Sequence, residues 1–336
     1  MSDNFTTYAL PLTPVDVATW TEYINEHIAL INTIFNRTLV SIHEHNWINT
    51  LQDAHDLYDD ALSFHNHRHI LEVFQFGICL LSKNRNVLRN VSSKDLKTFV
   101  LASIFHDAGH IGLTNDQIMN DLNDLNDLNA TVIMNNVWLY TKYDDDDTDY
   151  GPISDDASST PSYASSYNEN MHAELGHNVL EKHSIKYNRG LFAKLIRRTD
   201  LSHNGQFIEK QISYNPFYGN QIPGKSPELT ERVLSLLLKI ADVGHIVRPL
   251  PSHINYVINI HLERNPTTID VFNIPSDTVY FNNTFVKPLL ELLRDVNIGL
   301  SVKLLKLYDT NLQYWKSVEH FTRMANPKIW IKDACT

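Results

Sequence analysis

Apolar residues recur three and four positions apart over long stretches of this chain, and this helical periodicity constrains the fold more than any other feature. The clearest stretch is 227–242. Its apolar residues on one helical face are Leu229, Val233, Leu237 and Ile240. Ser226 and Pro227 come directly before it, and a capping hydroxyl followed by a proline at the first helical position is typical of a helix start. The segment therefore predicts a buried helix.

Three further segments carry the same periodicity. They are a run ending at Phe35 that follows Thr13-Pro14, residues 94–108 with Gly109 at their end, and residues 288–315. No convincing series of alternating strands occurs, and the chain has only 11 glycines in 336 residues, about half the usual share. We therefore predict an all-α fold, a single large multi-helix domain over residues 1–336.

Residues 120–168 break this pattern. The sequence DLNDLNDLN is followed by the acidic run Asp144–Asp147 and then by SDDASSTPSYASS. An acidic, Ser-rich stretch cannot bury enough apolar surface to offset the entropy of ordering, so we interpret 120–168 as a mobile insertion. A second loop is expected at 214–227, which contains two glycines and three prolines. Histidine and aspartate motifs lie on both sides of each loop, so neither is interpreted as a domain boundary.

Charge and cysteine usage narrow the class of protein. The chain has 28 Lys and Arg against 39 Asp and Glu, a net charge of −11, which argues against DNA or RNA as a partner. Only two cysteines are present, and no long apolar stretch or basic leader is found at the start. We expect a soluble cytoplasmic protein with no membrane partner, and the sequence leaves its oligomeric state open.

Histidine is unusually abundant, with 17 copies, and several lie in compact motifs. His65 and His69 are one helical turn apart in LSFHNHRH, and His106-Asp107 directly follows the apolar run LASIF. Asp242 ends another apolar helix. Such groups are costly inside apolar segments unless they are paired or bound to metal. Imidazole and carboxylate together suit zinc, and a site with more oxygen ligands suits magnesium or manganese.

The order of these motifs resembles a known family. The patterns H-N-x-x-H from His65, H-D-x-x-H-x-G-x-x-N from His106, and A-D ending at Asp242 resemble the catalytic domain of class I cyclic nucleotide phosphodiesterases. The segments 169–172 and 199–202 add to the similarity, which extends over about 60–320. Among the branches of the family, the chain looks closest to the fungal high-affinity cyclic AMP enzymes.

The resemblance implies a role for each motif residue. The ligands of a first metal, usually zinc, correspond to His69, His106, Asp107 and Asp242. Asp107 would bridge to a second metal, usually magnesium or manganese, and a hydroxide held between the two would attack phosphorus. His65 corresponds to the general acid that protonates the departing O3′. The residues that would orient metal-bound waters are His110, Glu169, His172 and Thr199.

Recognition of the base is where the sequence departs from the family. When Pro288 is aligned with a proline of the family, Phe281 falls at an aromatic residue that clamps the base, and Thr278 falls at a glutamine. The amide of glutamine makes two hydrogen bonds to the base, which the single hydroxyl of a threonine cannot replace. Ile260 falls at the opposite apolar clamp, and plain core packing remains an equal interpretation of both clamp residues. The chain departs from the family at two further places: Phe64 stands where the family has a tyrosine, and Gly244-His245 stands where it has a Ser-Asn pair. His245 is therefore included among the expected substrate contacts.

We therefore predict metal-dependent hydrolysis of 3′,5′-cyclic AMP to 5′-AMP, with Zn²⁺ and Mg²⁺ or Mn²⁺ as cofactors. Two alternatives stay open. One is another helical His-Asp phosphohydrolase, acting on deoxynucleoside triphosphates or alarmones. The other is a cyclic nucleotide sensor without catalytic activity, which is less favoured because structural metal sites are usually closed and rich in cysteine.

Overall fold

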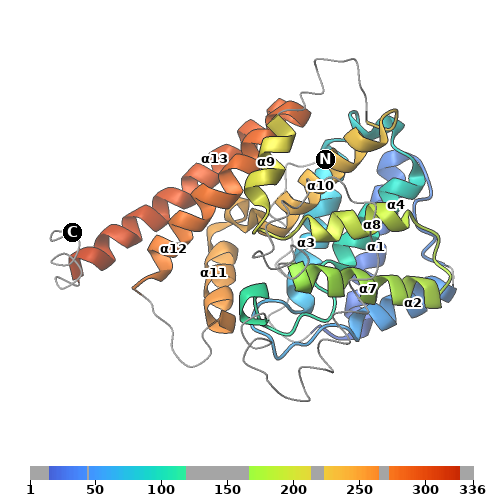
Figure 1. Cartoon of the computed structure of the whole chain (residues 1–336), viewed down its shortest axis with the longest axis horizontal. Coiled ribbons are helices and arrows are strands. Elements are labelled where there is room, and N and C mark those ends of the chain that lie inside the picture. Colours follow the sequence, from blue (N-terminus) through green and yellow to red (C-terminus); the bar gives the residue numbers. More distant parts are fainter. Residues whose placement is uncertain (1–14, 44, 119–165, 213–222, 265–271, 326–336) are drawn as a thin grey trace, which may run out of the picture.

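The computed structural model describes residues 15–43, 45–118, 166–212, 223–264 and 272–325. The helices are α1 (Val17–Phe35), α2 (His45–His55), α3 (His67–Lys83), α4 (Ser93–Phe105), α7 (Tyr167–Lys182), α8 (Arg189–Arg197), α9 (Asn204–Ile212), α10 (Pro227–Val243), α11 (Leu250–Arg264), α12 (Ile274–Phe281) and α13 (Lys287–Ala325) (Figure 1). Short 3-10 turns lie at Leu88–Asn90 and Gly244–Val247, and one π-helical turn lies at Asn282–Val286. No strand occurs within these ranges, and the all-α prediction is confirmed.

Helix ends follow the local chemistry of the chain. The predicted start of α10 is confirmed, because the Ser226 hydroxyl accepts a hydrogen bond from the Leu229 amide at 3.2 Å. α1 instead begins after Asp16, and the predicted Thr13-Pro14 start lies outside the described residues. α4 ends at Phe105, earlier than the predicted end at 108. The chain turns there, and Gly109 adopts a φ of 73°, a left-handed conformation that glycine tolerates best.

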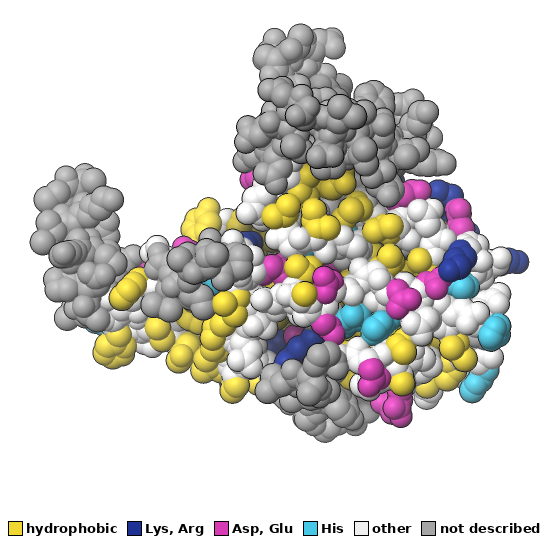
Figure 2. All heavy atoms as spheres, turned by 90° about the horizontal axis from the view of Figure 1, so that it is seen from below, with side chains coloured by type: hydrophobic (Ala, Val, Ile, Leu, Met, Phe, Trp, Pro, Cys, Tyr) yellow, Lys and Arg dark blue, Asp and Glu magenta, His cyan; other side chains and the backbone are white. Residues whose placement is uncertain are grey.

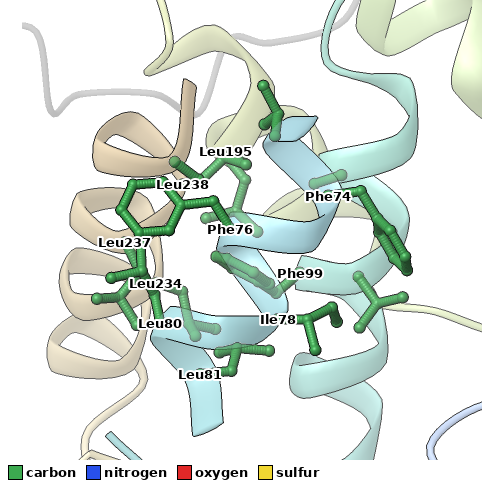
Figure 3. Packing of buried hydrophobic residues seen from close by; sticks show 14 of the residues in the cluster. Phe74, Phe76, Ile78, Leu80, Leu81, Phe99, Leu195, Leu234, Leu237 and Leu238 are labelled. Carbon is green, nitrogen blue, oxygen red and sulfur yellow. The ribbon is translucent and has the colours of Figure 1, made fainter. Parts of the chain in front are cut away.

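The core is built around α3, which packs against α1, α4 and α10. Figure 3 shows aromatic side chains of α3 and α4 meeting leucines of α10, with Phe76, Phe99 and Leu237 all buried. Gly77 permits the close approach of α4, because an added Cβ there would lie 3.1 Å from Phe99 Cε1. One continuous hydrophobic cluster extends from α1 to α13. One domain for the whole of 1–336 stays a prediction, since that range includes residues outside the described part.

The C-terminal helices project to one side of this core. α13 runs along α12 and continues beyond it (Figure 1), with a kink at Asn297, whose φ is −156°. Exposed apolar side chains on these two helices include Tyr280, Ile298 and Phe321. None of the helices within the described ranges has the length and apolar character needed to cross a bilayer.

The predicted loops lie largely beyond the described ranges. Residues 119–165 and 213–222 are not described, so the predicted mobility of 120–168 is untested. The end of that segment is helical, because α7 begins at Tyr167. On the face shown in Figure 2, histidine, acidic and basic side chains lie around a hollow near the middle of the surface.

Candidate active site

Four side chains from three parts of the fold converge on one point. They are His69 in the first turn of α3, His106 and Asp107 directly after α4, and Asp242 in the last turn of α10. One ligand atom from each lies within 4.8 Å of all the others. Asp107 Oδ2 is 3.1 Å from Nε2 of both His69 and His106, and Asp242 Oδ1 is 3.4 Å and 3.6 Å from the same two nitrogens. The structure thus brings together the predicted metal ligands.

Hydrogen bonds to Nδ1 orient both imidazoles. His106 Nδ1 lies 3.2 Å from the Ser103 carbonyl oxygen, and His69 Nδ1 lies 3.1 Å from the Tyr256 hydroxyl oxygen. That hydroxyl donates in turn to the Asp242 carbonyl oxygen at 3.1 Å, so it accepts from His69 Nδ1–H. Each ring therefore carries a hydrogen on Nδ1 and directs Nε2 at the two carboxylates, so that loss of the Nε2 proton leaves a lone pair for a metal ion, the arrangement that metal-binding histidines require.

The cluster fits a divalent cation. His69 Nε2, His106 Nε2 and Asp107 Oδ2 are buried and have no conventional hydrogen-bond partner among the described residues. Burial alone lowers the pKa of His106, but the carboxylates of Asp107 and Asp242 outweigh it and raise that pKa to about 10. The electrostatics of the cluster thus favour positive charge between the two carboxylates. Two nitrogens and two oxygens form a donor set that suits a divalent cation.

Beside the cluster, His65 pairs with Glu263, a residue near the end of α11. The prediction that His65 and His69 share a helical turn is wrong, because α3 begins at His67 with Asn66 as its N-cap and His65 lies before the helix. One carboxylate oxygen of Glu263 contacts His65 Nδ1, and the other accepts from the backbone amides of Phe64 and His65 at 2.7 Å and 3.0 Å. Although burial raises the pKa of Glu263, these hydrogen bonds and the His65 charge lower it to about 2. Glu263 is therefore ionised, and it fixes the orientation of the His65 ring with Nε2 available for proton transfer.

The four residues expected to orient water all line the same cleft, of about 240 Å³. His172 Nδ1 lies 2.7 Å from the Ala108 carbonyl oxygen, and burial lowers its pKa to about 4. His110 stacks on His65 with ring centroids 3.7 Å apart, and burial lowers its pKa to about 3. Both rings are therefore neutral at pH 7. The Thr199 hydroxyl donates to the Ile196 carbonyl oxygen at 2.7 Å.

Glu169 is the acidic member of this group. It accepts a hydrogen bond from Asn115 Nδ2 at 3.0 Å. Burial, followed by the charge of Asp200, raises the pKa of Glu169 to about 8. A carboxyl group held near neutral pH in this way can either donate or accept a hydrogen bond. No direct hydrogen bond joins Glu169, His110, His172 or Thr199 to the four converging residues in the described part of the chain.

The same cleft is lined by three of the four predicted substrate contacts, Phe281, Ile260 and His245. Thr278 is not among the lining residues. It lies buried on α12, where its hydroxyl donates to the Ile274 carbonyl oxygen at 2.6 Å, one turn back along the helix. The predicted contact between Thr278 and the base therefore has no support in the structure, because the threonine is turned into the helix and away from the cleft.

Two residues of the site escaped the sequence analysis. Glu263 is 198 residues from His65 in the sequence, and Tyr256 is 187 residues from His69. They lie seven positions apart on α11 and so project from the same helical face, but nothing in their local sequence marks them. Phe64, which stands where the resemblance expects a tyrosine, packs edge-on against Tyr256 at 4.4 Å between ring centroids. A tyrosine ring is thus present beside Phe64, supplied by α11.

Comparisons with known proteins agree with this geometry. Residues 64–137 match the family model of the 3′5′-cyclic nucleotide phosphodiesterases, and this segment contains His65, His69, His106 and Asp107. No curated protein matches the sequence.

Solved structures match over nearly the whole chain. The phosphodiesterase domain of the RhoPDE fusion protein from the choanoflagellate Salpingoeca rosetta is 21% identical, with a TM-score of 0.72, and the alignment covers 96% of this chain and 98% of that one. A second structure, the phosphodiesterase domain of Salpingoeca rosetta rhodopsin phosphodiesterase, is 20% identical, with a TM-score of 0.70 and coverage of 93% and 90%. At this identity the structural matches establish the fold. The predicted closeness to fungal enzymes stays a prediction.

Proposed function

Since the chain carries the catalytic domain of a class I 3′,5′-cyclic nucleotide phosphodiesterase, we propose that it hydrolyses 3′,5′-cyclic AMP to 5′-AMP in a reaction that depends on two divalent cations. The observation that carries the proposal is the convergence of four ligand atoms within 4.8 Å beside the His65–Glu263 pair. A metal site and a proton donor then share one cleft, as hydrolysis of a phosphodiester requires.

The proposed ligands of the first cation are His69, His106, Asp107 and Asp242. Asp107 Oδ1 would face a second cation, since Oδ2 is directed at the two histidines and Oδ1 lies 4.0 Å from His172 Nε2. Zinc for the first position, and magnesium or manganese for the second, follow from the donor types. When bound, such cations neutralise negative charge on the phosphoryl oxygens and lower the pKa of a water molecule. The protein holds the ligands in place through Tyr256 and Ser103.

His65 is the proposed general acid. The ribose O3′ leaves as a basic alkoxide unless it receives a proton, and His65 Nε2 is the nitrogen available to give one, because Nδ1 is engaged by Glu263. The side chain of His65 is 27% exposed and lines the cleft, so it can reach a bound substrate. His65 lies just before α3, and the hydrogen bonds from the Phe64 and His65 backbone amides to Glu263 hold it beside the metal site.

The preference for cyclic AMP is proposed from the resemblance to the fungal high-affinity enzymes. Ile260 and Phe281 lie in the cleft as the resemblance requires of an apolar clamp on a purine. Cytoplasmic location is proposed on the two-cysteine composition, which suits a reducing compartment.

The direct test is steady-state hydrolysis of cyclic AMP and cyclic GMP side by side, with and without a chelator, and with deoxynucleoside triphosphates and ppGpp in the same panel. We expect turnover of cyclic AMP that disappears on chelation and returns with zinc plus magnesium or manganese. Hydrolysis of a triphosphate or ppGpp in its place would favour the alternative phosphohydrolase. Tight binding of cyclic nucleotide without hydrolysis, with both metals present, would favour a sensor.

A further inference from the structure

One basic residue stands apart among the side chains that line the cleft. Arg264 is the last residue of α11, and it lines the cleft together with Ile260, one helical turn earlier. Within the described ranges no other lysine or arginine lines the cleft, whereas four acidic side chains do, those of Asp107, Glu169, Asp242 and Glu263. Arg264 is therefore the one permanent positive charge that the described residues place in the cleft.

The guanidinium of Arg264 has no acidic partner among the described residues. Its neighbour Glu263 contacts His65 and accepts from the backbone amides of Phe64 and His65. Arg264 is exposed, and no hydrogen bond or ion pair joins it to another described residue. A guanidinium has five N–H donors, no acceptor and a charge that persists at any physiological pH. It is therefore free to meet an anionic group that enters the cleft.

The position of Arg264 also has a local effect on its own helix. The carbonyl groups at the end of a helix carry partial negative charge, so a cation in the last turn of α11 stabilises the helix whether or not a ligand is present. Attraction of a ligand differs, because it changes the affinity for an anion and leaves the affinity for an uncharged ligand unchanged. Since Arg264 directly follows Glu263, which holds the proposed general acid, an anion attracted by Arg264 arrives beside the reaction centre.

We infer that Arg264 captures the anionic phosphate of the nucleotide, and that it strengthens the binding of both the cyclic substrate and the 5′-monophosphate product. The inference rests on the proposed function. The cyclic phosphate carries one negative charge, and a 5′-monophosphate carries about 1.5 to 2 at pH 7. The chain as a whole has a net charge of −11, so it repels such anions at long range. A fixed positive charge in the cleft offsets that repulsion where the substrate enters.

The first test compares the wild-type enzyme with Arg264→Gln in steady-state hydrolysis of cyclic AMP at low and high salt. At about 0.01 M salt, where charges act over about 30 Å, we expect kcat/KM to fall about 2- to 10-fold, mainly through KM. At about 1 M salt, where charges act over about 3 Å, the two enzymes should agree within about twofold. Arg294→Gln is the matched control, because Arg294 is exposed on α13 and does not line the cleft. An equal loss at both salt concentrations would overturn the capture of an anion.

The second test measures binding without turnover, by calorimetry with 5′-AMP and with adenosine. Arg264→Gln should weaken the binding of 5′-AMP about 2- to 10-fold, because an exposed charge pair is lost. Adenosine has the same base and ribose but no phosphate, so it should bind both enzymes equally. Arg264→Lys keeps the charge and should retain most of the affinity for 5′-AMP. An equal loss for adenosine and 5′-AMP would place the contact on the base or the ribose and would overturn the inference.

Two further outcomes separate this inference from a role in the helix and from the proposed function. A lower Tm of Arg264→Gln, with unchanged kinetics and unchanged binding of 5′-AMP, would leave Arg264 its effect on α11 alone and would overturn the capture. Absence of any cyclic nucleotide turnover by the wild type would overturn the proposed function, and the affinities for 5′-AMP and adenosine would still decide the role of Arg264. Normal turnover by the wild type, with an unchanged kcat/KM in Arg264→Gln at low salt, would overturn this inference alone.

Discussion

The ion pair between His65 and Glu263 makes the sharpest prediction about the reaction. In Glu263→Gln the charge is removed, while an amide oxygen remains to accept from the backbone amides of Phe64 and His65. The difference between the ordinary pKa of 4.5 and the value of about 2 corresponds to roughly 3 kcal/mol of preference for the ionised carboxylate. The carboxylate side chain is only 6% exposed, so solvent screens little of this energy.

Part of that energy is retained in Glu263→Gln, because the hydrogen bonds to the backbone amides can persist. The part at risk is the charge-assisted hydrogen bond to His65 Nδ1, for which about 1.5–3 kcal/mol is typical. We therefore expect kcat for cyclic AMP to fall about 10- to 150-fold. His65→Ala, which removes the acid itself, should cost about 10²- to 10⁴-fold.

A substrate analogue separates proton donation from other effects. When sulfur replaces O3′ of cyclic AMP, the leaving group is a thiolate, which needs no proton because the pKa of a thiol is about 8.5. The deficit of Glu263→Gln should therefore shrink to within about threefold on this analogue, with zinc content unchanged by elemental analysis. An equal loss on both substrates would refute the assigned roles of His65 and Glu263. Asp60→Asn is the matched control, since it alters a carboxylate–histidine contact of 2.6 Å to His67, which does not line the cleft.

Three further predictions concern the metal site, pH and the core. Tyr256→Phe removes the hydroxyl that accepts from His69, and metal affinity measured against a chromophoric chelator should weaken about 10- to 100-fold; an unchanged affinity would contradict the orienting role. In metal-free protein, Glu169 binds its proton more tightly in the native state than in the unfolded state, because its pKa is raised by folding. The free energy of unfolding should therefore fall as pH rises from about 4.5 to about 8. Glu169→Gln should abolish that trend and be more stable than wild type by up to roughly 5 kcal/mol above pH 8, as thermal unfolding in chelator would show. Phe99→Ala should lower the free energy of unfolding, measured in urea, by about 3–5 kcal/mol. A much smaller loss would mean that α3 and α4 move closer together and fill the space that the ring leaves.

The sequence predicts the parts of this protein in which local pattern and chemistry coincide. Ser226 and Pro227 mark the start of α10 because a cap acts within one turn. The convergence of His69 and His106 is predicted by the order of motifs that resembles the phosphodiesterase family, and the polar residues that follow apolar runs support it. The apolar pattern overstates the length of α4. The helix ends at Phe105, but Ala108 is still buried in the turn that follows and that carries His106 and Asp107 to the cluster. Apolar periodicity reports burial, and burial continues past the end of the helix.

Contacts that depend on long-range geometry could not be predicted in the same way. Glu263 reaches His65 only because α11 returns across the cleft, and no local signal distinguishes it from the other acidic residues of the chain. Counting back from Pro288 puts Thr278 at a base-binding position, but such a count fixes a distance along the chain and not the face of α12 on which a side chain lies. Its hydroxyl instead bonds to the backbone of its own helix, a common alternative for threonine.

Tyr256 connects the two halves of the site. Its hydroxyl oxygen holds His69 of the candidate metal site, and its ring stacks on His245, one of the predicted substrate contacts. Because the two contacts use different parts of one side chain, they can be separated by experiment. Tyr256→Phe keeps the ring and should weaken metal binding with little change in the KM for cyclic AMP at saturating metal, whereas Tyr256→Leu removes both contacts and should weaken metal binding and raise KM. If Tyr256→Phe raised KM as strongly as Tyr256→Leu at saturating metal, the hydroxyl would have to act on both sides, and the division of roles argued from this geometry would be wrong.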